Sequence, residues 1–388
     1  MTAQILKRPK LVCAPTKRRQ RMNLLVISTY VMEGIRKDAL FYLKLLRTLV
    51  GHPDVGLIGP AVIPFASLFV VESHARLSES GWSGAHAFDE AELHSIRAAR
   101  HRVKMLLSKK KDVGQLVAEF DAIVLAERQR FVGPHSGWLG PIKRWIQPDL
   151  GVSMIAGEVF STTHATRFSF GMPLDEASLR EASRLVARYC ADVADAVGGT
   201  PENASFSKLS LGLVMKDIKS EAFYRRGDLG ALELPWAGVV ALILANVNFV
   251  RRVLRAVVSG ESSAFVKVRV MTAFHAIESL RVVQDRLRSS GELPKVAADV
   301  LSKLATGEVR RLRRLSVLRD MLVHFKLREG KRVSVDLGYQ EQLAALSQGM
   351  TESELGELAD RVLATVAQVL AAGFDLGPHT FWYGAVGR

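Results

Sequence analysis

Cysteine is scarce in this sequence, and its scarcity limits the chemistry that the chain can support. Cys13 and Cys190 are the only cysteines among 388 residues. Two cysteines cannot build a disulfide framework or a metal site with four cysteine ligands. We therefore expect a protein with reduced thiols that resides in the cytoplasm.

Long apolar runs are also lacking. The longest, residues 236–250, contains Asn246 and Asn248 and falls short of the about 20 residues that a membrane-spanning helix needs. It predicts a buried helix and no membrane association. No apolar segment or cleavage site follows the basic N-terminus, so a signal peptide is not expected.

Common catalytic motifs are missing as well. The sequence contains no GxxxxGK[ST], HExxH, CxxC or GxSxG pattern. Phosphate loops, zinc proteases, thiol redox centres and serine hydrolases depend on these patterns. We therefore expect no cofactor and no metal.

Positive charge is abundant. Lys and Arg number 53 against 39 Asp and Glu, which gives a net charge of +14, and 48% of the residues are hydrophobic. This composition is typical of a globular protein, and the basic excess favours a polyanionic partner such as RNA. Residues 1–21 hold seven basic side chains and no acidic one, which predicts a flexible basic arm.

Helical periodicity dominates the rest of the chain and predicts a mainly α fold with short β pieces. A Thr351-Glu-Ser-Glu354 capping pattern opens the last helix. Strand-like alternation is expected only in short stretches such as 167–170 and 332–335. The predicted helices span 31–50, 64–76, 89–107, 112–130, 175–197, 235–258 and 263–288, two lie within 294–325, and the last spans 351–372.

Four segments of the first half match four of the second half in the same order. They pair 41–50 with 249–258, 71–73 with 277–279, 167–170 with 332–335 and 179–181 with 355–357. The order favours a tandem duplication into domains at 22–210 and 211–388, related by an approximate two-fold axis. The alternative is two unrelated helical bundles.

The most informative segment is the predicted helix near residue 320. At about 100° per residue, Asp320 and His324 share a side and Arg319 flanks them. Val323 lies between them, which is unusual for a solvent face and indicates an interface. The opposite stripe, the predicted local core, contains Leu315, Leu318, Met321, Leu322 and Phe325.

Arg319-Asp320 followed by His324 resembles the R-x₄₋₆-H motif of HEPN domains, which are helical bundles of toxins, abortive-infection proteins and other antiviral defence enzymes. The resemblance covers residues 230–375 best. It implies that two bundles pair to form one metal-independent ribonuclease site. It further implies His324 as general acid/base, Arg319 as phosphate clamp and Asp320 as the group that orients the histidine or the ribose.

A duplicated chain should carry a partner motif in its first half. Arg128 and His135 have six residues between them, and Arg130 and His135 have four. Gly133-Pro134 interrupts the helix there, so the first motif departs from the family form. The first domain is then either catalytically intact or degenerate.

Supporting residues follow from the same comparison of the two halves. Glu72 and Glu278 occupy equivalent positions, where each either aims a motif arginine or is a solvated surface glutamate. A run of arginines before the second motif either tracks an RNA backbone or forms a charged outer face. The run consists of Arg310, Arg311, Arg313 and Arg314.

These patterns predict a HEPN-type endoribonuclease, related to toxins or defence proteins, with a composite site between its halves. RNA and an antitoxin or other regulatory protein are the expected partners, and the oligomeric state stays open. One alternative is a non-catalytic HEPN-like adaptor that binds RNA or a protein. A DNA-binding regulator would need a compact helix-turn-helix, which the sequence does not display.

Overall fold

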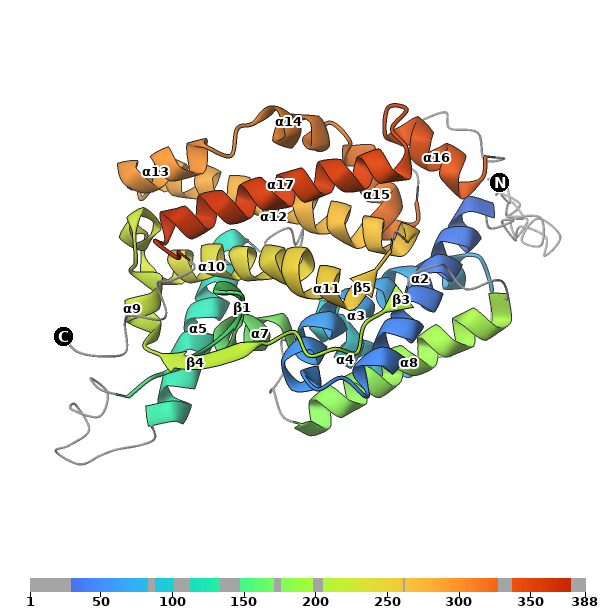
Figure 1. The fold of residues 1–388 in the computed structure, drawn as a ribbon, viewed down its shortest axis with the longest axis horizontal. Coiled ribbons are helices and arrows are strands. Elements are labelled where there is room, and N and C mark those ends of the chain that lie inside the picture. The colour runs from blue at the N-terminus through green and yellow to red at the C-terminus, as the bar shows by residue number, and fades with distance from the viewer. Residues whose placement is uncertain are drawn as a thin grey trace, which may run out of the picture.

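The computed structural model describes residues 29–82, 88–100, 112–132, 147–170, 176–197, 205–260, 262–326 and 337–377. The protein is mainly helical, as predicted (Figure 1). The basic arm at 1–21, His135 and residues 332–335 lie outside the described residues.

The first half builds a group of three packed helices, α2 (Thr29–Leu49), α3 (Val55–Glu79) and α8 (Glu176–Val197). Helix α4 (Glu90–Arg100) packs on α3 and α8, while α5 (Val113–Val132) lies toward the other end of the molecule (Figure 1). Helix α3 starts nine residues before the predicted 64–76 segment and contains both Pro60 and Pro64.

The second half builds a matching group from α10 (Leu234–Asn248), α12 (Ser263–Ser290) and α17 (Glu352–Gly373), which also pack on one another. A π-helical turn, η2 (Phe249–Leu254), extends α10 and leads into α11 (Arg255–Val257). The predicted capping pattern is confirmed, because Thr351 Oγ1 accepts from the Glu354 N–H while the Glu354 side chain accepts from the Thr351 N–H.

Shorter helices complete the second half. Where the sequence predicted two helices, the structure has three, α13 (Lys295–Ser302), α14 (Gly307–Arg313) and α15 (Ser316–His324). Helix α16 (Tyr339–Leu346) then packs against α2 and connects to α17.

Two small antiparallel sheets accompany the helices. Strands β1 (Leu150–Ile155), β2 (Glu158–Thr162) and β4 (Val214–Ile218) form one sheet in the order β2-β1-β4. Strands β3 (Ser205–Phe206) and β5 (Val258–Ser259) form the other. Two short helices, α9 (Ser220–Tyr224) and the 3₁₀ helix η1 (Asp228–Ala231), follow β4.

One of the proposed repeat matches joins elements of different kinds, and in another the first member is not the predicted strand. The predicted strand at 167–170 is wrong, because these residues form the end of helix α7 (Thr163–Phe170). Residues 41–49 are α-helical, whereas most of 249–258 forms the π turn. The matches of 71–73 with 277–279 and of 179–181 with 355–357 do join helices, α3 with α12 and α8 with α17.

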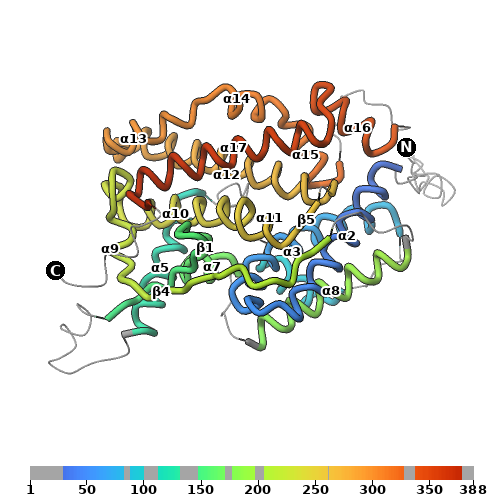
Figure 2. The backbone as a smooth tube through the Cα atoms, in the orientation of Figure 1, coloured from blue at the N-terminus to red at the C-terminus, as the bar shows by residue number. Residues whose placement is uncertain are grey.

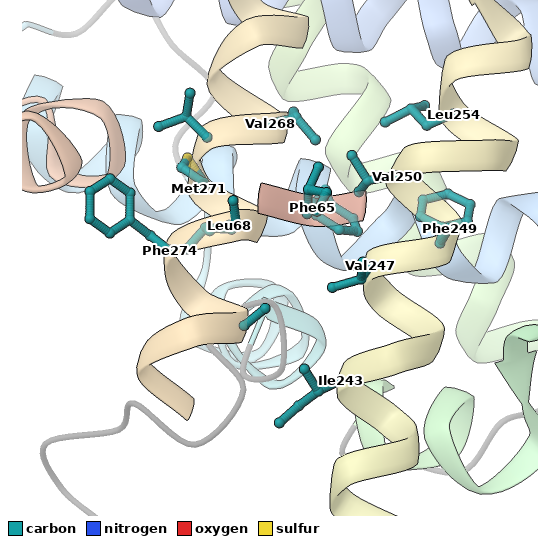
Figure 3. Packing of buried hydrophobic residues seen from close by; sticks show 14 of the residues in the cluster. Phe65, Leu68, Ile243, Val247, Phe249, Val250, Leu254, Val268, Met271 and Phe274 are labelled. Carbon is teal, nitrogen blue, oxygen red and sulfur yellow. The ribbon is translucent and has the colours of Figure 1, made fainter. Parts of the chain in front are cut away.

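One continuous apolar core joins the two halves (Figure 3). Phe65 on α3 stacks against Phe249 with ring centroids 5.9 Å apart. Figure 2 shows the chain of the first half below, in blue and green, and the last helices above, in orange and red. The two halves meet where α2 contacts α12 and where α3 contacts α15. These contacts position the candidate site.

Two of the described helical segments, Val55–Glu79 and Leu234–Val257, are long and apolar enough to cross a membrane. Their most apolar windows are 61% and 83% buried inside the protein. Core helices of soluble proteins share this length and composition, so the finding is weak evidence for a membrane span. Residues 236–250 are almost entirely buried, as predicted.

Candidate active site

Helix α15 carries the predicted motif at the junction of the two halves. Its predicted apolar stripe is buried, as are Asp320 and Val323 on the motif side. The motif side therefore faces protein at Asp320 and Val323, as the position of Val323 predicted, and solvent at His324. The helix ends at His324, and Phe325 adopts a left-handed conformation with a φ of 49°.

His324 pairs with a carboxylate from the other half of the chain. Its Nδ1 lies 2.7 Å from Oε2 of Glu72 on α3. An ionised carboxylate only accepts hydrogen bonds, so the imidazole donates its Nδ1–H to Glu72. The Glu72 side chain is 12% exposed, whereas that of His324 is 43% exposed. This arrangement leaves Nε2 as the basic nitrogen of the imidazole.

Arg319 and Asp320 form a second ion pair one turn earlier on α15. Arg319 Nη2 lies 2.7 Å from Asp320 Oδ1, and both side chains are largely buried. The Arg319 Nε–H is buried without a hydrogen-bond partner among the described residues. Asp320 thus holds one edge of the guanidinium.

A buried ion pair lies behind these residues. Lys267 on α12 contacts Asp38 on α2, and its ammonium also lies 3.8 Å from the ring centroid of Phe325. Burial lowers the pKa of Lys267, which the charges of Asp38 and Glu72 oppose. Burial raises the pKa of Asp38, and Lys267 opposes that rise.

Lys267 therefore acts on both members of the His324–Glu72 pair. It interacts with Glu72 through its charge and with His324 through the neighbouring Phe325. It anchors Phe325, the residue next to His324, by a cation–π contact. Phe69, which precedes Glu72 by one helical turn, packs edge-on against the same Phe325 ring at 6.4 Å. The left-handed Phe325 is thus held by two elements, which fixes the end of α15.

The structure does not bring the first motif to this site. Arg128, at the far end of α5, pairs with Asp149 at 3.4 Å and with Glu221 at 3.8 Å. Arg130 approaches Glu127 at 3.9 Å. Helix α5 lies at the opposite end of the molecule from α15 (Figure 1). A composite site containing Arg128 and Arg130 together with Arg319 and His324 is therefore not formed.

Arg128 lies beside a buried polar cluster that has a structural role. Asp149 is buried and accepts hydrogen bonds from the N–H and the hydroxyl of Ser220, at 2.6 and 2.9 Å. His164 Nδ1 lies 3.1 Å from the hydroxyl of Tyr224 beside them. Burial lowers the pKa of His164 to about 4, against a smaller opposing effect of Asp149. This buried cluster ties α7, β1 and α9 together.

The two glutamates at equivalent positions have different partners. Glu278 pairs with Arg313 at 2.9 Å and with Arg281 at 3.0 Å, on the outer surface of α12 and α14. Glu72 instead binds His324. The predicted run Arg310, Arg311, Arg313 and Arg314 lies on or directly after α14 and is exposed.

Sequence reasoning missed Asp38 and Lys267. A feature of the sequence does indicate both residues, because each places a charge within an apolar helical stripe. Asp38 follows Ile35 and precedes Tyr42 on the buried face of α2. Lys267 lies between Val266 and Val268 in the fully buried first part of α12. Charges at such positions are almost always paired.

No protein-family model, no curated protein and no solved structure matches this chain. Among the described residues, no group of three or more His, Cys, Asp or Glu side chains is arranged to hold a metal ion.

Proposed function

We propose that this chain is a metal-independent endoribonuclease of the HEPN type, with His324, Glu72, Arg319 and Asp320 at its active site. The contact between His324 and Glu72 carries the proposal. A half-exposed histidine, held at one nitrogen by a largely buried carboxylate, is the standard arrangement of a general base. The site combines the two halves, since Glu72 belongs to the first and the motif to the second.

The chemistry uses the nucleophile that RNA itself supplies. His324 Nε2 takes the proton of a ribose 2′-hydroxyl, whose oxygen then attacks the adjacent phosphorus. The bond from phosphorus to the 5′-oxygen breaks, and that oxygen leaves with a proton from the solvent or from a protonated histidine. The products are a 2′,3′-cyclic phosphate and a 5′-hydroxyl, and no oxidant or metal enters the balance.

Arg319 serves as the phosphate clamp in this proposal. A guanidinium matches the geometry of phosphate oxygens and stabilises the extra negative charge of the transition state. Asp320 keeps the guanidinium in place through one nitrogen, at 2.7 Å. The exposed arginines of α14 then provide a basic path along which the RNA backbone can lie.

The proposed tandem duplication is supported by the matching helix groups. In the first half α2, α3 and α8 pack together, and in the second half α10, α12 and α17 do so. Glu72 and Glu278 stand on the corresponding central helices α3 and α12. Arg128 and Arg130 of the first half have other partners, and the first half contributes Glu72 to the proposed site.

An RNA-cleavage assay tests the proposal. Purified wild-type protein is incubated with labelled single-stranded RNA in EDTA, beside H324A, R319A and the control H94A, which changes an exposed histidine of α4. We expect H324A and R319A to cleave about 100-fold or more slowly than wild type and H94A to match it. Equal rates for wild type and H324A would contradict the proposal.

One observation favours a second candidate, a non-catalytic HEPN-like adaptor that binds RNA. Paired HEPN sites use two motifs, and Arg128 and Arg130 lie on α5, which Figure 1 shows in the other half of the molecule from α15. The adaptor predicts RNA binding without cleavage, and equal binding by wild type and H324A. The same assay, combined with an RNA-binding measurement, separates the two candidates.

A further inference from the structure

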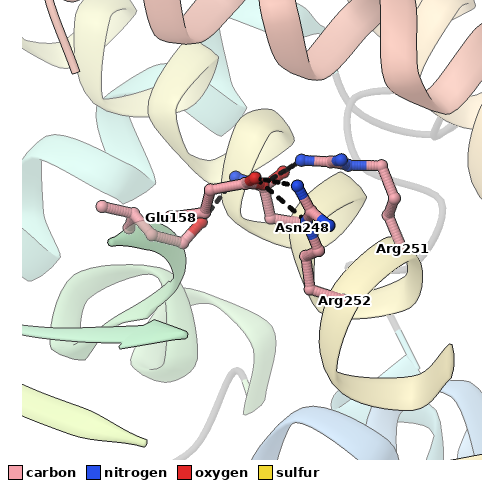
Figure 4. Close-up of polar contacts among 5 residues, drawn as sticks. Glu158, Asn248, Arg251 and Arg252 are labelled. Atoms are coloured by element: carbon pink, nitrogen blue, oxygen red, sulfur yellow. Dashed lines mark hydrogen bonds and ion pairs between the residues drawn. The ribbon is translucent and has the colours of Figure 1, made fainter. Parts of the chain in front are cut away.

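A second polar cluster lies on the π turn that follows α10, away from α15. Arg251 and Arg252 are consecutive in sequence, yet both guanidinium groups contact the single carboxylate of Glu158 (Figure 4). Consecutive side chains diverge by about 100° on an α-helix. The wider π turn η2 reduces this divergence and lets the two guanidinium groups converge, and such turns are frequent at functional sites.

The cluster has more positive than negative charge. Two guanidinium groups share one carboxylate, and the Arg251 Nε–H is buried without a hydrogen-bond partner among the described residues. Desolvation, with the nearby charge of Arg252, lowers the pKa of Arg251 to about 10. A carboxylate therefore balances only half of the charge that this turn concentrates. A doubly charged free phosphate, or two neighbouring backbone phosphates with one charge each, would balance all of it.

The cluster is accessible and its geometry suits a tetrahedral oxyanion. The Arg252 side chain is 45% exposed and that of Arg251 is 19% exposed. Asn248 Oδ1 accepts from Arg251 Nη2 at 3.3 Å, which holds this guanidinium independently of Glu158. Two guanidinium groups fixed side by side present several parallel N–H donors to phosphate oxygens.

Glu158 reaches the arginines from the first residue of β2, directly after a tight turn. The turn between β1 and β2 consists of Ala156 and Gly157, with φ values of 48° and 80°. Alanine is strained in this left-handed region, and such strain concentrates at switch and ligand sites. The strand behind Glu158 is held separately, since Asn248 Nδ2 donates to the Val159 carbonyl at 2.9 Å.

We propose that Arg251 and Arg252 form a binding site for a phosphate group, and that Glu158 occupies it in this structure as an internal competitor. The phosphate belongs either to an RNA backbone or to a free phosphate compound, and the experiment below separates these sources. The inference is independent of the proposed nuclease activity, because it concerns binding at residues outside the α15 site.

The test measures binding with the full chain, in the H324A background so that RNA stays intact. Inorganic pyrophosphate and a short single-stranded RNA are titrated separately into H324A, H324A/E158Q and H324A/E158Q/R252Q. An R286Q change in the H324A/E158Q background is the matched control, since Arg286 is exposed on the last turns of α12. Ionic strength is held constant throughout.

We expect E158Q to raise the affinity for at least one ligand by about 10-fold or more, because it removes a competing charge from the two arginines. R252Q should abolish the gain, and R286Q should keep it. A gain for RNA alone identifies backbone phosphate, whereas a gain for pyrophosphate identifies a free phosphate compound. Unchanged affinity for both ligands in a folded E158Q variant would overturn the proposal.

A second measurement tests the proposal if the E158Q variant does not fold. Thermal unfolding of the protein with wild-type residues at 158 and 252 is followed with rising pyrophosphate against chloride of equal ionic strength. The site predicts a rise in Tm with pyrophosphate that R252Q removes and R286Q retains. No rise in Tm, or a rise that R252Q leaves intact, would equally overturn it.

Discussion

Glu72 on α3 and His324 on α15 are separated by 252 positions in the sequence, yet the Glu72 Oε2 and the His324 Nδ1 lie 2.7 Å apart. This contact ties the first half of the chain to the motif of the second half. It gives the imidazole a fixed orientation and leaves Nε2 as the nitrogen that would act in the proposed reaction.

Replacing Glu72 by glutamine therefore tests the pair directly. E72Q keeps the size of the side chain but removes the charge that orients and stabilises a protonated imidazole, so we expect kcat for RNA cleavage to fall by about 10- to 100-fold. E79Q, on the exposed end of the same helix, is the control. If both variants cleave like wild type, Glu72 has no part in the reaction.

Lys267 and Asp38 allow a prediction about stability. K267M leaves the Asp38 carboxyl buried without its partner and should reduce the free energy of unfolding by about 3–5 kcal/mol. D38N/K267M removes both charges and should recover a large part of that loss. Urea unfolding of K267M, D38N and the double variant measures this coupling. A double variant with the full additive loss would show that the pair is not coupled.

His164 predicts a pH dependence of stability. Its pKa is about 4 in the folded protein against 6.5 as the ordinary value, so the unfolded chain binds more protons between these pH values. The stabilising contribution is complete above pH 6.5 and is lost as the pH falls toward 4, by about 2 kcal/mol at pH 5.

Urea unfolding at pH 7 and pH 5 checks this expectation. Wild type should lose about 2 kcal/mol more than H164Q between the two pH values, because glutamine does not titrate. H94Q, which changes an exposed histidine, should behave like wild type. Equal losses for wild type and H164Q would mean that His164 is not held neutral in the fold.

A variant of Arg128 tests whether this residue has a structural or a catalytic role. Its partners are Asp149 and Glu221, and its side chain is 44% exposed. We expect R128Q to change the free energy of unfolding by less than about 1 kcal/mol and to leave RNA cleavage within about two-fold of wild type. A folded R128Q variant that has lost cleavage would restore Arg128 to the active site.

The helices were largely predictable from sequence because each depends on local periodicity. The stripe through Leu318 and Leu322 on α15, and the capping pair Thr351 and Glu354 on α17, are examples. Alternation over four residues was less informative. Phe168 and Phe170 are both buried, but they lie at the end of a helix, because so short a run fits either period.

The candidate site was only partly predictable. The motif placed Arg319, Asp320 and His324 on one helix, and the equivalent positions of Glu72 and Glu278 in the two halves singled out Glu72. The partner of Glu72 depends on how α3 and α15 pack, which no local pattern encodes. The same limit explains Arg128, whose spacing to His135 fits the motif while its partners, Asp149 and Glu221, come from distant segments.

The most direct test of the account is the chemistry of the RNA ends. Single-stranded RNA is incubated with wild type and H324A in EDTA, beside an analogue with 2′-deoxyribose at every position, and the products are analysed by mass spectrometry. We predict 2′,3′-cyclic phosphate ends from wild type, none from H324A and an intact deoxy analogue. Cleavage of the deoxy analogue, or the same cyclic ends at the same rate from H324A, would contradict the account.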